Sequence, residues 1–288
     1  MEYRISKSTL ENDPLYETLS ALQQSLSAVE LQLYVVGACA RDIALKVLRA
    51  PASARRTIDV DVAIALDNWD MFDTVSQQLQ GDHFRKDPHV KQRFYYMGKD
   101  GNNDYEVDVV PFGPLANNEI IGWPPEGNPE MSVRCFEDVM KDADTIILDN
   151  DVRFRIASLS GQFLIKLDAW IDRHLSTDKD ARDMFYLIDN FYWTSIVDKF
   201  PPPTQVMDGD GTAFDTFIAG AQWIAAELRL MLTQEHSNYY SNFIWHELEQ
   251  EEGSLLVQHL VIASGDNRTE NYSRIRTALR NIQNILSE

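Results

Sequence analysis

The stretch RRTIDVDVAIAL (55–66) places two carboxylates, Asp59 and Asp61, inside an apolar segment. Its apolar residues alternate with the others, which predicts a β-strand over 57–66. Successive strand side chains point to opposite faces, so Asp59 and Asp61 project from the same side and lie close together. Like charges repel at that separation unless a positive charge lies between them. The stretch therefore predicts a strand that holds a cation at one face.

Length and composition predict a globular protein with a substantial core. The chain has 288 residues, of which 44% are hydrophobic and 25% charged, enough for one large or two medium domains. No apolar run is long enough to span a bilayer, and the first residues contain no signal-peptide core, so we expect a cytoplasmic protein without a membrane partner. Cys39 and Cys135 lie in apolar surroundings without metal-ligand spacing, which predicts buried free thiols.

The net charge of −19, from 45 acidic and 26 basic residues, argues against a surface that grips nucleic acid as a whole, and we expect no DNA partner. The charge is uneven, because residues 183–252 contain twelve acidic side chains but only Lys199 and Arg229 as basic ones. Basic residues gather in the N-terminal half. A groove near Arg41, Arg55 and Arg93 could thus admit a phosphorylated small molecule or the 3′ end of an RNA.

The order of expected elements predicts an α+β fold. We expect a first domain over 1–159, with a mixed β-sheet flanked by helices, and a helical domain over 160–288. Helices are expected at 14–29, 38–50 and 67–80, the last capped by Asp67 or Asn68. Strands are expected at 31–37 and 57–66, as a pair within 93–113, and as a hairpin over 144–159 that turns at Asn150.

A third carboxylate has the same apolar setting as the first two. In YEVDVVPFG (105–113), Asp108 stands between Val107 and Val109 on an expected strand. A carboxylate in such a place is costly to bury unless it meets a cation. Three carboxylates on neighbouring strands suit a hard cation, for which Mg²⁺ is the ordinary occupant and Mn²⁺ an alternative. The plainer interpretation is that a D-x-D pair belongs to a solvated sheet edge.

The segment VVGACARD (35–42) is a strand that runs through a glycine directly into a helix. Small residues at this junction, Gly37 and Ala38, let backbone N–H groups approach an anion at the helix N-terminus. Arg41 follows one turn later and can reach a phosphate or pair with Asp42. Such junctions are also common as simple turns.

In their order and context, these motifs resemble the polymerase-β-like nucleotidyltransferase superfamily. GACARDIAL…RRTIDVDVAI is similar to the G-G-x-x-R-D…D-I-D pattern of tRNA-nucleotidyltransferase-like members. IASLSGQFLIKLDAWIDRHLSTDKDARDMFYLI (156–188) is similar to the K-L-x-A-x-x-x-R…K-D-x-x-D-L helices of bacterial AbiEii-type nucleotidyltransferases, which include toxins of abortive-infection and toxin–antitoxin systems. The resemblance covers about residues 30–190 and implies a nucleotidyltransferase-type sheet.

The resemblance also implies roles for individual residues. Asp59 and Asp61 would bind one or two Mg²⁺ ions that grip the phosphates of a nucleoside triphosphate. Asp108 would complete the metal site and help to deprotonate the acceptor hydroxyl. The implied nucleotide-binding residues are Gly37, Ala38, Arg41, Lys166, Arg173, Lys179, Asp180 and Asp183, with Lys166 and Arg173 on one helix face that points into the nucleotide cleft.

Two departures from the family pattern leave an inactive descendant open. Ala38 stands where the superfamily usually has glycine or serine, and the span from Gly37 to Asp59 is longer than in many members. The helical motifs also have a plainer interpretation, since Lys166 and Arg173 suit a solvated helix face. Lys179 and Asp183 likewise suit an ordinary surface pair.

We therefore expect an enzyme that transfers an NMP from ATP, CTP, GTP or UTP to an acceptor hydroxyl on a tRNA end, a protein or a small molecule. The AbiEii likeness alone implies a role in toxicity or phage defence and an antitoxin partner. The alternative is a catalytically silent protein of the same fold that binds a nucleotide or a partner. A metal-dependent phosphohydrolase is disfavoured, because no His/Asp cluster supplies a two-metal hydrolytic site. DGDGTAFD (208–215) is expected to be a loop, and the aromatic residues of 238–245 to pack helices.

Overall fold

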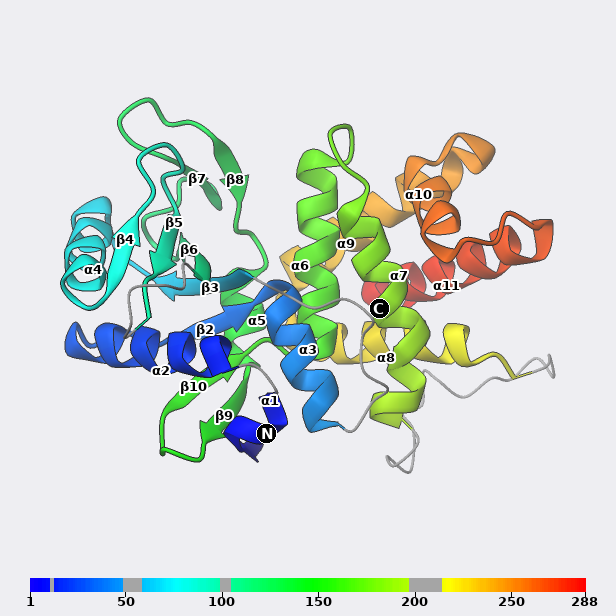
Figure 1. The fold of residues 1–288 in the computed structure, drawn as a ribbon. Helices are drawn as coiled ribbons and strands as arrows, with labels where there is room; N and C mark the ends of the chain where they lie inside the picture. The colour runs from blue at the N-terminus through cyan, green and yellow to red at the C-terminus, as the bar shows by residue number, and fades with distance from the viewer. Residues whose placement is uncertain (11–12, 49–58, 99–104, 197–213) are drawn as a thin grey trace. The chain divides into compact units, whose positions relative to one another are not determined.

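The computed structural model describes residues 1–10, 13–48, 59–98, 105–196 and 214–288. The chain divides into two compact units, Met1–Ser158 and Leu159–Glu288 (Figure 1). The first unit contains a mixed sheet with helices, and the second is helical. The expected α+β fold class is therefore confirmed.

The described residues of the first unit form an eight-stranded sheet in the order β1-β9-β10-β2-β3-β6-β5-β4. The pairs β1·β9, β10·β2 and β3·β6 are parallel, and the remaining neighbours are antiparallel. A separate two-stranded sheet joins β7 to β8. The strands are β1 (Glu2–Ile5), β2 (Tyr34–Val36), β3 (Asp59–Ala65), β4 (Phe84–Lys86), β5 (Arg93–Tyr96), β6 (Tyr105–Phe112), β7 (Ile120–Gly122), β8 (Glu130–Ser132), β9 (Asp144–Leu148) and β10 (Arg153–Ile156).

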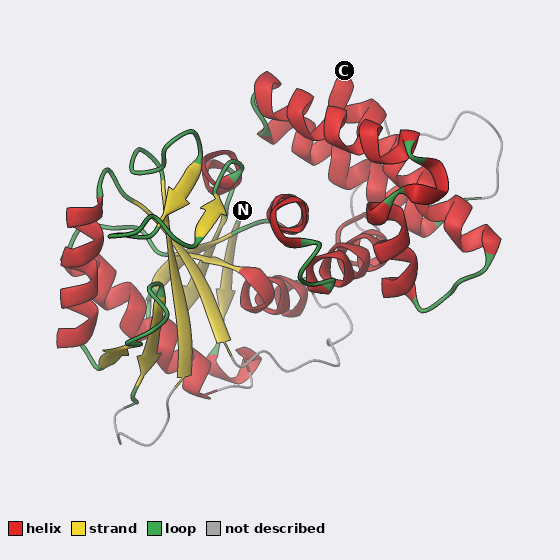
Figure 2. Cartoon of the chain, turned by 90° about the horizontal axis from the view of Figure 1, so that it is seen from above, coloured by secondary structure: helices red, strands yellow, loops and turns green. Residues whose placement is uncertain are grey.

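Helices lie on both sides of this sheet (Figure 2). The Asn68 side chain accepts a hydrogen bond from the Met71 N–H and so caps α4, as one of the two expected caps. Gly37 begins α3 directly after β2, which confirms the expected strand–glycine–helix succession. The helices of this unit are α1 (Lys7–Leu10), α2 (Asp13–Ala28), α3 (Gly37–Val47), α4 (Trp69–Gly81) and α5 (Phe136–Lys141).

The two faces of the central strands differ sharply in burial. Val60, Val62 and Ile64 of β3 are fully buried, whereas the alternate residues Asp59 and Asp61 are only half-buried. Lys86 of β4 lies in the same cross-strand row as Val60 and therefore on the apolar face. It donates a hydrogen bond to Ser76 of α4 at 3.0 Å, so this face packs on α4. Burying each such apolar side chain contributes about 1.5–3 kcal/mol, so the strand's orientation is strongly specified. The polar face carries the carboxylates.

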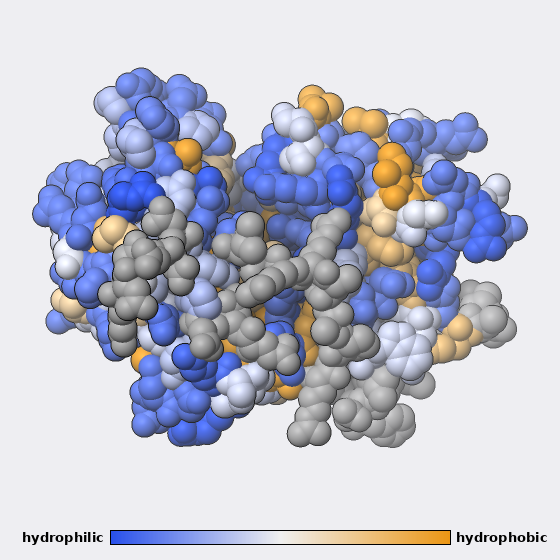
Figure 3. Space-filling model, in the orientation of Figure 1, coloured by the Kyte–Doolittle hydropathy of each residue, from blue (hydrophilic) through white to orange (hydrophobic). Residues whose placement is uncertain are grey.

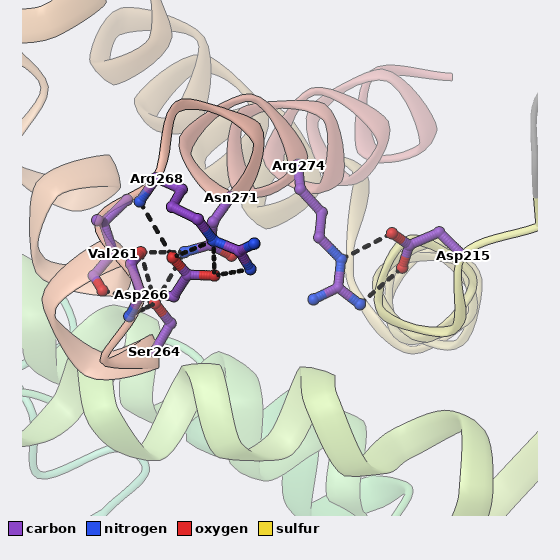
Figure 4. A network of polar contacts seen from close by, with 7 residues as sticks. All are labelled: Asp215, Val261, Ser264, Asp266, Arg268, Asn271 and Arg274. Atoms are coloured by element: carbon purple, nitrogen blue, oxygen red, sulfur yellow. Dashed lines mark hydrogen bonds and ion pairs between the residues drawn. The ribbon is translucent and has the colours of Figure 1, made fainter.

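The second unit is a set of helices with several buried polar contacts. The Tyr240 hydroxyl donates to the Asp168 carboxylate at 2.8 Å, with both side chains buried. In the turn after α10, Asp266 accepts hydrogen bonds from Arg268 (Figure 4). Elsewhere in this unit, Asp215 accepts two hydrogen bonds from Arg274. Its elements are α6 (Leu159–Arg173), α7 (Lys179–Phe191), the π-helix η1 (Tyr192–Ile196), α8 (Thr216–Met231), α9 (Gln234–Glu249), the 3₁₀ helix η3 (Glu251–Gly253), α10 (Leu255–Ser264) and α11 (Thr269–Ser287).

Several short elements were not expected from the sequence. These are α1, β1, β4, β7, β8 and α5, each of three to six residues, too short for a periodic pattern to stand out. Arg55 of the expected basic groove, and most of the expected loop at 208–215, lie outside the described residues.

The viewed surface is mostly hydrophilic, with small separate hydrophobic patches (Figure 3). Both cysteines are buried and neither forms a disulfide, as expected. Among the described residues, no helix has the length and apolar character needed to cross a membrane.

Candidate functional site

The pairing of β3 with β6 brings the three predicted carboxylates together on one sheet face. Asp59 and Asp61 share that face of β3, and Asp61 lies in register with Asp108 on β6. Because the strands are parallel, residues in register point to the same side, with neighbouring strands about 4.8 Å apart. The structure thus places a carboxylate of β6 beside the pair on β3.

Two further charged residues lie on this face, of which Glu106 was missed from the sequence and Arg93 was expected in a groove for a phosphate or an RNA end. Glu106 lies in register with Asp59, and Arg93 of β5 lies in register with Asp108. The alternation in YEVDVV already puts Glu106 on the same side as Asp108, so a signal was available. Nothing local showed that β5 would bring Arg93 across from Asp108. We call Asp59, Asp61, Glu106 and Asp108 the carboxylate face.

Arg93 holds two members of the carboxylate face. Its Nε donates to Asp108 Oδ1 at 2.8 Å and its Nη2 to Asp108 Oδ2 at 2.9 Å. A further ion pair joins Arg93 Nη2 to Glu106 Oε1 at 2.7 Å. Despite this contact the pKa of Glu106 is raised, because burial and the charges of Asp108 and Asp59 outweigh the attraction of Arg93. Burial and the neighbouring carboxylates thus disfavour the ionised form of Glu106.

Gly37 has a steric reason to be glycine. Its φ is +66°, in the left-handed region, and a Cβ at this position would lie 2.1 Å from Asp61 Oδ2. The start of α3 thus approaches the Asp61 side chain more closely than any other residue type allows. Ala38 follows in the first turn of α3, so both residues of the predicted phosphate cradle lie at this helix start.

Arg41 and Cys39, also on α3, are buried beside charged groups. Arg41 donates to Asp42 Oδ1 from both Nε, at 3.0 Å, and Nη2, at 2.8 Å, which is one of its two predicted roles. Burial raises the pKa of the Cys39 thiol, and the charges of Asp42, Asp61 and Asp59 raise it further. Cys39 is buried as predicted, and because its thiol also lies near these carboxylates it stays protonated.

The predicted residues of α6 and α7 form an ion-pair network within the second unit. Lys166 pairs with Asp183 at 2.8 Å and with Asp180 at 3.6 Å. Arg173 donates to Asp180 Oδ2 from Nε at 2.7 Å and to Oδ1 from Nη2 at 2.8 Å. Asp180 is fully buried and only 15% of the Lys166 side chain is exposed, so the alternative of a solvated face is wrong for Lys166. We call the paired residues Lys166, Arg173, Asp180 and Asp183 the α6–α7 network. Lys179 begins α7, one residue before Asp180.

Burial and charge act in opposite directions on Asp180. Burial alone raises the pKa of its carboxyl, but the Arg173 hydrogen bond and the charges of Lys166, Arg173 and Lys179 lower it. The net pKa lies below the usual aspartate value, and the carboxylate is ionised at neutral pH. A buried charge of this kind is stable only while its partners remain.

The carboxylate face has the right donor chemistry for a hard cation but is not assembled around one. Carboxylate oxygens are the ligands that Mg²⁺ prefers, and three of them share this face. Yet among the residues that the structure describes, no group of three or more His, Cys, Asp or Glu side chains is arranged to hold a metal ion. Both carboxylate oxygens of Asp108 instead accept hydrogen bonds from Arg93.

No family model and no curated protein sequence matches this chain. Among solved structures, the chain is similar to an antigenic nucleotidyltransferase-like protein from Paracoccidioides brasiliensis. The identity is 18% and the TM-score 0.41, over 62% of this chain and 76% of that chain. The function of this chain is therefore inferred from its own side chains.

Proposed function

We propose that this protein is a Mg²⁺-dependent nucleotidyltransferase that moves an NMP from a nucleoside triphosphate to an acceptor hydroxyl. The observation that supports it is the placement of Asp59, Asp61 and Asp108 on one face of β3 and β6, against the glycine that starts α3. Carboxylates beside the N–H groups of a helix start suit a metal-bound phosphate, because the two groups bind its opposite charges.

In this proposal the acceptor oxygen attacks the α-phosphorus, a new P–O bond forms, and the bond to pyrophosphate breaks. Bound Mg²⁺, or Mn²⁺ in its place, would neutralise charge that develops on the phosphate oxygens. Asp59 and Asp61 would hold it, and Asp108 accepts the proton of the acceptor hydroxyl. The backbone N–H groups of Gly37 and Ala38 bind the triphosphate.

The remaining nucleotide-binding assignments stay proposals. The basic residues are Arg41, Lys166, Arg173 and Lys179, and the acidic partners are Asp180 and Asp183. In the structure Arg41 and most of the second-unit residues are engaged in ion pairs, so contact with a phosphate requires that those pairs open or that the cations serve both partners. The same proposal includes an acceptor that is a tRNA end or a protein, and an AbiEii-like role with an antitoxin. It leaves open which nucleotide base the enzyme selects.

One observation favours a second candidate, a silent protein of this fold that binds a nucleotide or a partner without transfer. The Arg93 guanidinium engages both oxygens of Asp108, the carboxylate to which the transfer assigns proton abstraction. A carboxylate held in this way is a poor base, since its negative charge is already stabilised.

Transfer is tested with each of the four α-labelled nucleoside triphosphates, Mg²⁺, and total RNA or cell lysate as the acceptor. We expect label on a macromolecule, and its loss in Asp59→Asn and Asp61→Asn. The control is Asp67→Asn, because Asp67 is an exposed residue just beyond the end of β3. Nucleotide binding without label or pyrophosphate, for every nucleotide and acceptor, would instead support the silent binding protein.

A further inference from the structure

The contacts of Arg93 resemble those of a cation bound at the carboxylate face. Its guanidinium donates hydrogen bonds to both oxygens of Asp108, and Nη2 also forms an ion pair with Glu106 Oε1 at 2.7 Å. A cross-strand ion pair that served only to join β5 to β6 would need one partner. Arg93 instead takes two, on the face where Asp59 and Asp61 add further negative charge. Only 26% of the Arg93 side chain is exposed, so the guanidinium is partly shielded from water.

A divalent cation and this guanidinium require the same Asp108 oxygens. Bidentate arginine–carboxylate pairs are among the stronger hydrogen-bonded contacts in proteins, because both partners are charged and the geometry is fixed. A ligand that binds only after such a pair opens has its apparent affinity reduced by the fraction of molecules in the open state.

We propose that Arg93 is a built-in counter-ion that competes with the divalent cation for Asp108, so that metal binding requires the guanidinium to leave this carboxylate. The inference rests on the proposed function only in taking the carboxylate face as the metal site. It makes Arg93 a residue that sets metal affinity, and Glu106 the second carboxylate that holds the guanidinium in place.

The test measures binding of Mn²⁺ alone by electron paramagnetic resonance, with no nucleotide present. We expect Arg93→Gln to bind Mn²⁺ at least about ten-fold more tightly than the wild type, because a hydrogen bond to a charged group no longer has to be broken. Asp108→Asn added to Arg93→Gln should reverse the gain. The control is Lys91→Gln, which removes the same charge at an exposed position two residues away and should change the affinity less than about two-fold, since exposed charges are screened.

Arg93→Lys provides a second variant if Arg93→Gln does not fold, as judged by circular dichroism. Lysine keeps the charge but lacks the fork, so we expect an intermediate gain of a few-fold. An affinity of Arg93→Gln equal to that of Lys91→Gln, or weaker than the wild type, would overturn the inference. Tighter Mn²⁺ binding by Arg93→Gln without nucleotidyl transfer would support the inference and contradict the proposed function. Nucleotidyl transfer without tighter Mn²⁺ binding would support the proposed function and contradict the inference.

Discussion

On the carboxylate face, Arg93 of β5 pairs with Glu106 and Asp108 of β6, whereas in the α6–α7 network Lys166 and Arg173 pair with Asp180 and Asp183. The carboxylate face is half-buried, while Asp180 is fully buried. A balanced, buried cluster gains its stability from its own partners. Neighbouring half-buried carboxylates repel one another, and in the proposed function a bound cation would relieve that repulsion.

The comparison predicts the largest loss of stability in the α6–α7 network. Asp180→Asn should lower the free energy of unfolding by about 3–5 kcal/mol, because it removes the fully buried anion that pairs with Arg173 and with the largely buried Lys166. Urea denaturation measures this value. The control is Asp178→Asn at the N-cap of the same helix, whose exposed pair with Arg182 should contribute far less to stability. Equal effects for the two variants would contradict a special role for the buried aspartate.

The next largest effect is expected where α3 meets the carboxylate face. Gly37→Ala should cost about 1–3 kcal/mol, since its φ is left-handed and the new Cβ would collide with Asp61. Gly81→Ala is the matched control, because nothing lies within 4 Å of a Cβ at that helix end, and it should be neutral or stabilising by up to about 1 kcal/mol. Thermal unfolding of both variants gives the comparison, and unchanged stability of Gly37→Ala would speak against the close approach.

A smaller effect of opposite sign distinguishes the two clusters most directly. Asp59→Asn should raise the free energy of unfolding by up to about 1 kcal/mol, because it removes a like charge in register with Glu106. Asp67→Asn, beyond the strand, should leave stability unchanged. A loss of more than about 1 kcal/mol in Asp59→Asn would show that this carboxylate is paired as tightly as Asp180.

The smallest expected effect is a difference in titration. The pKa of Glu106 is raised above its usual 4.5, so its contribution to stability falls as the pH rises from 4.5 through the folded pKa. The pKa of Asp180 is lowered below its usual 3.8, so its contribution is complete above 3.8 and falls as the pH drops through the folded pKa. Carbon-13 NMR of the carboxyl groups measures both, and shifts in the same direction would break the comparison.

Much of the fold could be predicted because its signals are local. The alternation around Asp59 identified β3, and Gly37 after an apolar run identified the junction of β2 with α3. The helical C-terminal part followed from its periodicity. Short elements such as β1 and β4 could not be predicted, since their few residues form strands only because neighbouring strands pair with them.

The candidate site shows the same contrast between features set by local sequence and features set by the pairing of distant segments. That Asp59 and Asp61 share a face could be predicted from the sequence alone, because side-chain direction in a strand has a period of two residues and needs no partner. Long-range packing was needed to place Asp108 beside Asp61 and Arg93 across from Asp108, and to bury Asp180 among cations. Strand register and helix packing join residues far apart in the chain, and the free energy that selects them comes from burial of the whole core rather than from the local sequence.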